Sequence, residues 1–298
     1  MIASNVKPKI ETGITLVTLK EMQSCADETL AFFIQTMPGV PFGIGDVDFI
    51  FSPKKEMVAR FKAFAEQYAP ERLRSLADHH FETLESQLFG NAIIGREKSA
   101  AILRRDYKLE RDNLRRIVFH ELMHIYCAKT EMDGEHFIDV YGSGHTPDLN
   151  PENKVYDGQV SAGYAVWSEF VAEYFATIKA VPDKHYFNDI VEMVFNLLGD
   201  VTAADTDAKY CFAMMSAYIL SCADARKAIE DINEISDGSP NGEAATLALQ
   251  ECLVFLHNHV QGKRPCTITE EFIQELGCKY LMFLIRNSVY LGAVGQEL

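Results

Sequence analysis

One segment of the chain has residue types and a spacing suited to metal chemistry, the sequence His-Glu-Leu-Met-His at residues 120–124. Residues four apart on a helix share one face, with Cβ atoms roughly 5–6 Å apart, so His120 and His124 can direct two imidazole nitrogens at one point. Glu121 lies beside them, placed to take a proton from a metal-bound water rather than to bind the metal. The pattern predicts a zinc ion (Zn2+) held by both histidines, with Glu121 as the general base.

A catalytic zinc ion usually takes three protein ligands and leaves its fourth position to water. The best source of a third ligand is the aromatic segment at residues 167–176, Trp-Ser-Glu-Phe-Val-Ala-Glu-Tyr-Phe-Ala. Glu169 and Glu173 are four apart and share a helical face, and the small Ala172 beside them allows another helix to come close. Because the helix around these two glutamates is so aromatic, a role near the metal is favoured over the alternative that both side chains merely form a solvated face.

This combination resembles the gluzincin peptidases, the thermolysin-like and aminopeptidase-like metalloenzymes, in which HExxH is followed by a glutamate on a later helix. Residues 168–172 match the family pattern Asn-Glu-x-x-Ala loosely, and Glu169 with Glu173 match its pattern Glu-x-x-x-Asp with Glu in place of Asp. The resemblance implies that Glu169 is the third ligand. It also implies that Glu173 holds the other N–H of one histidine and fixes its tautomer. It covers only about residues 89–180.

Two other families of zinc peptidases fit less well. A metzincin needs glycine at position 127 and histidine at position 130, where this chain has Cys127 and Thr130, so that family is excluded. The aspzincins take an aspartate ligand from a longer pattern, which residues 139–142, Asp-Val-Tyr-Gly, match in part and with the wrong spacing. Asp139 is therefore the alternative third ligand.

Hydrolysis of a carbonyl compound also needs a donor for the oxyanion that forms when hydroxide attacks, and enzymes of this kind use Tyr, His or Arg. The possible transition-state stabilisers are Tyr164 and Tyr174, about one turn before and after Glu169, and His145 in the preceding segment. The sequence does not choose among them, because most tyrosines in such segments are packing residues.

The elements that must position these residues indicate an α+β fold. Residues 1–130 predict a small mixed α/β zincin lobe that ends in the active-site helix. Its expected elements are helices over 19–36, 54–68 and 71–88, strands over 46–51, 89–95 and 100–107, and a helix from about 110. Residues 131–159, rich in acidic residues, Gly and Pro with a single Lys, predict an acidic active-site loop.

Residues 160–298 predict a mostly α-helical lobe that carries the third metal ligand. The expected helices cover 160–180, 184–199, 206–234, 242–261 and 268–288. Thr267 followed by Glu270 is typical of a capping box that opens the last of them.

Composition narrows the choice of partners and location. The 298 residues carry a formal net charge of -15, which repels nucleic-acid phosphates and anionic membranes, so we expect no nucleic acid and no membrane as a partner. Seven scattered cysteines without a CxxC pair argue against a disulfide scaffold. No apolar run approaches the roughly 20 residues that span a bilayer. The opening residues lack the apolar core of a secretory signal, so the expected location is cytoplasmic, with export by a route that reads no such signal left open.

We therefore expect a zinc-dependent hydrolase, most readily a metallopeptidase that acts on a peptide or protein substrate. The acidic loop favours basic or amino-terminal substrates. One alternative is a regulatory or binding protein that retains a zincin domain with little proteolytic activity, and another is a helical scaffold in which HELMH is accidental. The intact Glu121 favours the enzyme, because a purely structural metal does not need it, and Glu121 is expected on an exposed face of its helix. The oligomeric state does not follow from the sequence.

Overall fold

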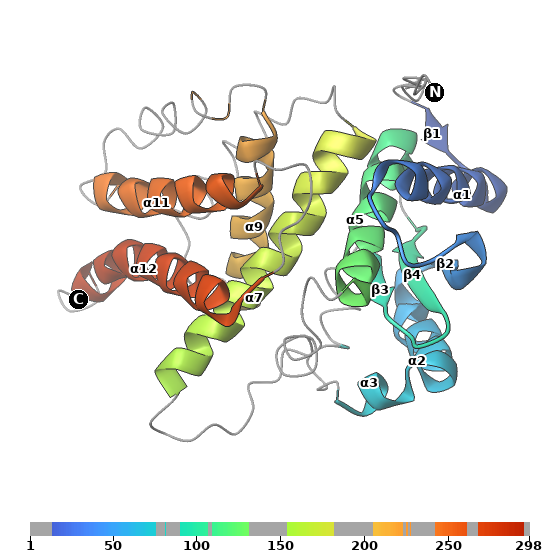
Figure 1. The fold of residues 1–298 in the computed structure, drawn as a ribbon, viewed down its shortest axis with the longest axis horizontal. Helices are drawn as coiled ribbons and strands as arrows, with labels where there is room; N and C mark the ends of the chain where they lie inside the picture. Colours follow the sequence, from blue (N-terminus) through green and yellow to red (C-terminus); the bar gives the residue numbers. More distant parts are fainter. Residues whose placement is uncertain are drawn as a thin grey trace.

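The computed structural model describes residues 14–75, 81, 90–106, 109–130, 154–181, 205–222, 225, 227, 242–260 and 268–294. The protein is mostly helical with two small sheets, in agreement with the predicted α+β class (Figure 1). No helix within these residues is long and apolar enough to cross a membrane. Asp139, His145 and the helix expected over 184–199 lie outside the described residues.

A three-stranded sheet with the strand order β2-β4-β3 lies beside the HELMH helix. Its strands are β2 (Val47–Ser52), β3 (Gly90–Ile93) and β4 (Ser99–Arg104). β2 is parallel to β4, whereas β3 is antiparallel to it. Alternate side chains of β4 face opposite sides, so Ala100 and Ile102 pack on α2 (Met57–Tyr68), whereas Ala101 and Leu103 join the main core. Among the described residues, β3 is an outer strand of this sheet and lies next to the HELMH helix.

The remaining elements of the first part are mostly helices. They are β1 (Thr15–Leu16), α1 (Leu19–Thr36), η1 (Ile44–Asp46), η2 (Lys54–Glu56), α2 (Met57–Tyr68), α3 (Pro70–Ser75), β5 (Leu109–Glu110) and α5 (Arg111–Lys129). α1 begins at a capping box, in which Glu21 N donates to Thr18 Oγ1 at 3.2 Å and Thr18 N donates to the Glu21 carboxylate at 2.9 Å. β1 and β5, two residues each, form an antiparallel pair that the sequence analysis missed.

The described residues of the second part are helical, as expected, with two corrections. Its elements are α7 (Lys154–Phe175), the π-helical turn η3 (Ala176–Ala180), α9 (Asp205–Ser221), α11 (Gly242–Val260) and α12 (Glu270–Val294). The expected loop end at residue 159 is wrong, because α7 already begins at Lys154. The capping box expected at Thr267 is also wrong in register. Glu270 is the first residue of α12, and Thr269 Oγ1 accepts from Phe272 N at 3.2 Å.

α7 and α12 cross at a point where their backbones touch. A Cβ atom on Gly163 would lie 1.9 Å from the carbonyl oxygen of Ile273, and one on Gly277 would lie 1.8 Å from the carbonyl oxygen of Gln159. The single tryptophan, Trp167, is buried one turn further along α7 and meets the ring of Phe272 edge-on at 4.9 Å. The crossing therefore fixes the half of α7 that leads into the Glu169 segment.

α5 stands between the two parts of the chain. In Figure 1 the helix has α7 on one side and α1 with the sheet on the other, while α9, α11 and α12 lie beyond α7. One continuous apolar cluster includes buried residues from α1, the sheet, α5, α7, α9, α11 and α12. The division at residues 130 and 160 stays a prediction, since both parts contribute to this cluster.

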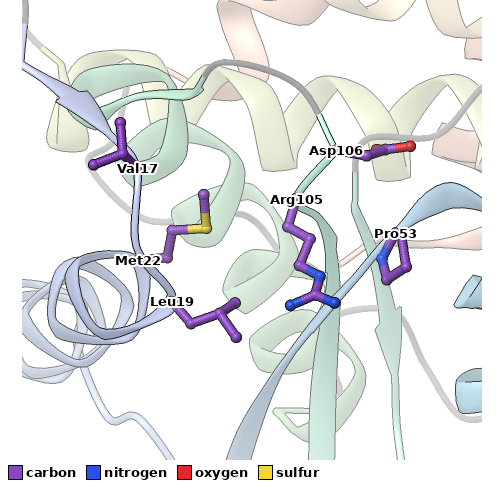
Figure 2. A pocket seen from close by; sticks show the side chains of 6 residues that line it. All are labelled: Val17, Leu19, Met22, Pro53, Arg105 and Asp106. Carbon is purple, nitrogen blue, oxygen red and sulfur yellow. The ribbon is translucent and has the colours of Figure 1, made fainter.

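An open hollow lies where β1 leads into α1, near the carboxyl ends of β2 and β4 (Figure 2). It is lined by Val17, Leu19, Met22, Pro53, Arg105 and Asp106. The Asp106 carboxylate is already engaged, since Lys54 N and Arg104 Nε each donate to it at 3.1 Å. No lining residue belongs to α5 or α7, so the hollow is separate from the residues singled out by the sequence.

Candidate metal centre

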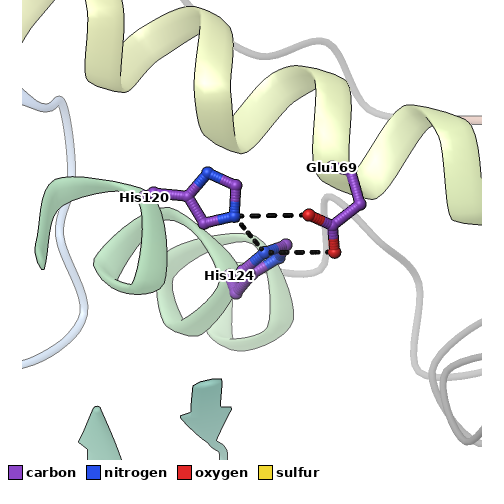
Figure 3. Close-up of side chains that lie close together, drawn as sticks. All are labelled: His120, His124 and Glu169. Carbon is purple, nitrogen blue, oxygen red and sulfur yellow. Dashed lines mark hydrogen bonds and ion pairs between the residues drawn. The ribbon is translucent and has the colours of Figure 1, made fainter. Parts of the chain in front are cut away.

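The HELMH helix presents its histidines away from one apolar stripe. The stripe is fully buried and consists of Leu114, Val118, Leu122 and Ile125. At 100° per residue, His120 lies about 155° and His124 about 115° from the centre of that stripe. The stripe joins the main core, and the two histidines face α7 (Figure 3). The position of the apolar residues thus determines the direction in which the imidazoles point.

Three side chains converge between α5 and α7. His120 Nε2 lies 3.0 Å from His124 Nε2 and 3.3 Å from Glu169 Oε2, and His124 Nε2 lies 3.6 Å from Glu169 Oε1. Figure 3 shows the Glu169 carboxylate turned toward both rings. A tetrahedral zinc ion with ligand bonds of about 2.0–2.1 Å separates its ligand atoms by roughly 3.3 Å. The two separations from His120 Nε2 are close to that edge length, and with one ligand atom taken from each residue the three atoms lie within 4.8 Å of one another. The donor set therefore fits a zinc ion in number and type, at a spacing that small side-chain movements can adjust.

The remaining ring nitrogens are also occupied, by two different partners. His120 Nδ1 lies 3.0 Å from Glu173 Oε2, and His124 Nδ1 lies 3.3 Å from Ser168 Oγ. A partner on Nδ1 orients the imidazole and leaves Nε2 for the centre. α7 therefore supplies both a candidate ligand, Glu169, and a support for each histidine.

Glu173 is the most deeply buried charge of this group, with an exposed fraction of 0%. Its Oε1 accepts hydrogen bonds from Arg116 and, at 3.5 Å, from Thr177 Oγ1. Burial tends to raise the pKa of Glu173, but the positive charges of Arg116 and His120 outweigh it and lower the pKa. Glu173 is thus held as a carboxylate in a site without solvent.

His120 and Glu169 each shift the pKa of the other. Burial alone would lower the pKa of His120, but hydrogen bonds to Glu169 and Glu173 and the negative charges of Glu169 and Glu121 raise it to about 10. Burial would raise the pKa of Glu169, and the two histidines more than reverse that effect. The group stabilises positive charge at the point where the imidazoles and the Glu169 carboxylate meet.

Glu121 lies against the outer strand of the sheet rather than in solvent. Its exposed fraction is 5%, the backbone N–H of Ala92 donates to its carboxylate, and a Cβ atom on Gly90 would lie 2.6 Å from its Oε1. Burial raises the pKa of Glu121 to about 8, although the positive charge of His120 opposes the shift. The expectation of an exposed face is therefore wrong, because β3 covers this side of α5.

The two tyrosines singled out by sequence lie on other faces of α7 than Glu169. Each is five residues from Glu169, which is about 140° around a helix. Tyr164 has an exposed fraction of 6%, and Tyr174 stacks on Phe170 with ring centroids 5.7 Å apart. Their role in stabilising a transition state stays a prediction, and His145 lies outside the described residues.

Sequence analysis missed another tyrosine, Tyr210 of α9. Desolvation of its hydroxyl and the negative charges of Glu169, Glu173 and Glu121 raise its pKa, and Arg116 opposes them. Tyr210 still has 38% of its surface exposed. A hydroxyl that senses all four charged groups, on a residue that is partly exposed, is a candidate donor toward a substrate. No sequence signal marks it, since it stands in an ordinary helical pattern outside the residues of the family resemblance.

The buried charges can be balanced by one divalent cation. With neutral histidines, the group holds three carboxylates, of Glu121, Glu169 and Glu173, against the single guanidinium of Arg116. Buried charge is costly unless it is compensated, and the two positive charges of a zinc ion would leave none in excess. The net charge of this group therefore favours a divalent cation, as the geometry of the candidate ligands does.

The chain matches no protein-family model, no curated protein and no solved structure. The interpretation of the centre therefore depends on its own geometry and charge.

Proposed function

We propose that the protein is a zinc-dependent hydrolase, a peptidase with a gluzincin-type centre in which His120, His124 and Glu169 hold the metal. The observation that carries this proposal is the convergence of the two Nε2 atoms and the Glu169 carboxylate at separations of 3.0, 3.3 and 3.6 Å. These residues come from two helices far apart in the sequence. The Nδ1 atom of each histidine also meets a side chain of α7, Glu173 for His120 and Ser168 for His124.

The chemistry divides between the metal and the side chains around it. Zinc, when bound, lowers the pKa of a coordinated water to roughly 7 and polarises a substrate carbonyl. Glu121 takes the proton of the attacking water and passes it to the leaving amine. Its buried site supports this role, since burial raises the pKa of Glu121 and makes the carboxylate a stronger base than one in solvent. Tyr210 is our candidate for the donor that stabilises the oxyanion.

We further propose that the sheet and α5 form a zincin lobe. Support comes from β3, which is antiparallel to β4, lies next to α5 and meets the Glu121 side chain with its backbone. An extended peptide that pairs with an outer strand gains main-chain hydrogen bonds and is held in a defined register. Such pairing at β3 would bring a peptide bond next to Glu121, which favours peptides as the substrate class.

Replacement of Glu121 by Gln tests the enzymatic role. Gln keeps an oxygen that can accept from Ala92 N–H but cannot take up a proton, so Glu121→Gln should keep its zinc and lose roughly 10²-fold or more of its activity. The assay uses a mixed peptide library at neutral pH after the zinc content of each protein has been measured. Glu110→Gln, an exposed position just before α5, is the matched control and should cleave as wild type does. Equal cleavage by zinc-loaded wild type and Glu121→Gln contradicts the mechanism.

Metal content tests the ligand set. His120→Ala, His124→Ala and Glu169→Ala should lose zinc, whereas His257→Ala on α11 and Asp139→Ala should keep it. Zinc retained by Glu169→Ala and lost by Asp139→Ala would favour the alternative ligand. A wild type that binds zinc but cleaves no peptide of the library would favour the regulatory or binding protein.

A further inference from the structure

Glu173 is held from both ends by side chains of α5. One of its oxygens meets His120 Nδ1 at 3.0 Å, and the other accepts from Arg116 Nη1. Arg116 and His120 are four residues apart on α5, so both face α7 along the same line. The carboxylate therefore lies between a candidate ligand and a fixed positive charge.

Arg116 is itself fixed by a third helix. Its Nη1 also donates to the hydroxyl of Tyr218 on α9 at 3.2 Å, and only 18% of its side chain is exposed. Tyr218 has an exposed fraction of 4% and belongs to the main core. α5, α7 and α9 thus meet at one guanidinium, which has little room to move.

This arrangement determines how His120 is presented. A buried carboxylate keeps its orientation only while its hydrogen bonds and its opposite charge are present. Without Arg116, Glu173 Oε1 would lose its charged partner and keep only the 3.5 Å hydrogen bond from Thr177, and the hold of Glu173 on His120 Nδ1 would weaken. An imidazole without a firm partner on Nδ1 changes its tautomer and its ring angle, and metal affinity falls.

We propose that Arg116, anchored by Tyr218, is a positioning residue of the metal centre that fixes Glu173 against His120 and thereby sets zinc affinity. This inference rests on the proposed zinc site. The hydrogen bonds of Arg116 to Glu173 and Tyr218 place it behind His120, so its effect on the candidate ligand atoms runs through Glu173 and His120.

Two variants separate positioning from ordinary packing. Arg116→Met keeps the length and apolar stem of the side chain but removes the charge and its donors, whereas Arg116→Lys keeps the charge. Arg115→Met is the matched control, because Arg115 is the neighbouring arginine of α5, is buried even more deeply, with an exposed fraction of 7%, and its charge acts on Cys25 at the α1 side of the helix. Unfolding midpoints of all variants show whether each one folds.

The first measurement needs no metal. The Nδ1–H proton of His120, bonded to Glu173, should give a slowly exchanging resonance in the nuclear magnetic resonance spectrum, assigned by its loss in His120→Ala. We expect the resonance in wild type, Arg115→Met and Arg116→Lys, and its loss or rapid exchange in folded Arg116→Met. A resonance that persists unchanged in Arg116→Met overturns the proposal.

The second measurement is the zinc dissociation constant by competition with a chelating dye. Arg116→Met should bind zinc about 10–100-fold more weakly than Arg115→Met, and Arg116→Lys should recover most of the affinity. Equal dissociation constants for Arg116→Met and Arg115→Met overturn the proposal. A wild type that shows the protected Nδ1–H, loses it in Arg116→Met and binds no zinc would support the positioning by Arg116. That same result would contradict the proposed zinc hydrolase.

Discussion

The negative charges of the carboxylates around His120 can be neutralised either by protons or by a metal ion. Without a metal, the carboxylates of Glu169 and Glu173 raise the pKa of His120 to about 10, and burial raises that of Glu121 to about 8. At neutral pH both groups then hold a proton. Zinc needs an unprotonated His120 Nε2, and its charge favours the ionised form of Glu121. Zinc binding should therefore release both protons.

We predict that zinc affinity rises steeply with pH. Below about pH 8 two protons leave for each zinc ion bound, so the dissociation constant should fall by about a hundredfold per pH unit, a factor of ten for each proton. Above that pH only the proton of His120 remains, and the slope should halve on a logarithmic scale. Glu121→Gln removes one of the two protons and should show the smaller slope throughout. Competition titrations in a series of buffers measure the slope, and a constant affinity would contradict this charge balance.

Removal of the Tyr210 hydroxyl is a second test at the residue scale. If it donates to the oxyanion, Tyr210→Phe should lower kcat about 10²–10³-fold and leave the zinc content and KM almost unchanged. Tyr174→Phe is the matched control, since its ring stacks on Phe170 and the site carboxylates do not contribute to its pKa. Steady-state kinetics on one cleaved peptide decide between them. Loss of activity in Tyr174→Phe or Tyr164→Phe, with Tyr210→Phe active, would favour the tyrosines chosen from the sequence.

How far the sequence predicts this site depends on the distance between residues along the chain. The i, i+4 spacing brought His120 together with His124, and Glu169 together with Glu173, because helix geometry is local. Tyr210 was missed, since only the packing of α9 against α7 brings it to the site. Arg116 has the local i, i+4 spacing to His120, but its partners Glu173 and Tyr218 lie on other helices, far away along the chain. The burial of Glu121 was missed for a similar reason. β3 covers Glu121, and the spacing of apolar residues within α5 does not indicate a contact with a strand.

At the scale of elements, the crossing of α7 and α12 determines where the Glu169 segment lies. Gly163 and Gly277 let the two backbones touch, and Gln274 Nε2 donates to Gln159 Oε1 at 2.9 Å beside them. Any side chain at either glycine must push the helices apart. A shift of α7 moves Glu169 relative to the histidines of α5.

We predict that Gly163→Ala destabilises the protein by about 1–3 kcal/mol, the usual cost of overpacking, although alanine is the better helix former. Gly158→Ala on the same helix is the control, because a Cβ atom there meets nothing within 4 Å. It should be neutral or stabilising by up to about 1 kcal/mol. Urea unfolding curves give both values. Equal stability of the two variants would show that the crossing is loose.

Element boundaries follow the strength of local signals in the sequence. α1 lies where the apolar spacing and the polar Thr18 predicted it, over Leu19–Thr36. α7 begins earlier than predicted, because Gly158 and the acidic composition before it favour a loop, whereas packing of this helix on α12 outweighs that preference. β1 and β5 are two residues long, too short for any alternation of side chains to mark them.

At the scale of the whole molecule, the candidate ligands join both parts of the chain. α5 packs on α1 and the sheet, α7 packs on α9 and α12, and both helices share one apolar cluster. A metal ion held between α5 and α7 therefore connects parts that must separate when the protein unfolds.

We predict that zinc stabilises the entire fold. A ligand that binds only the folded state adds about 4 kcal/mol at a free concentration of about 1,000 times its dissociation constant. Removal of zinc with a chelator should lower the unfolding temperature of wild type and of His257→Ala by a similar amount. His120→Ala should not respond. Differential scanning calorimetry measures the shift, and the same response in His120→Ala would place the stabilising metal elsewhere.

The burial of Trp167 against Phe272 has a practical consequence for optical work on this protein. Trp167 is the only indole among the 298 residues and stands two positions before Glu169. Its emission, excited selectively at the red edge of the absorption band, comes from a single place, the junction of α7 with α12. Cobalt or copper ions bound at the centre would quench that emission at close range, and denaturation would shift it to longer wavelength. One fluorophore that the chain already carries thus reports both the filling of the metal site and the melting of the helices around it, with no label added.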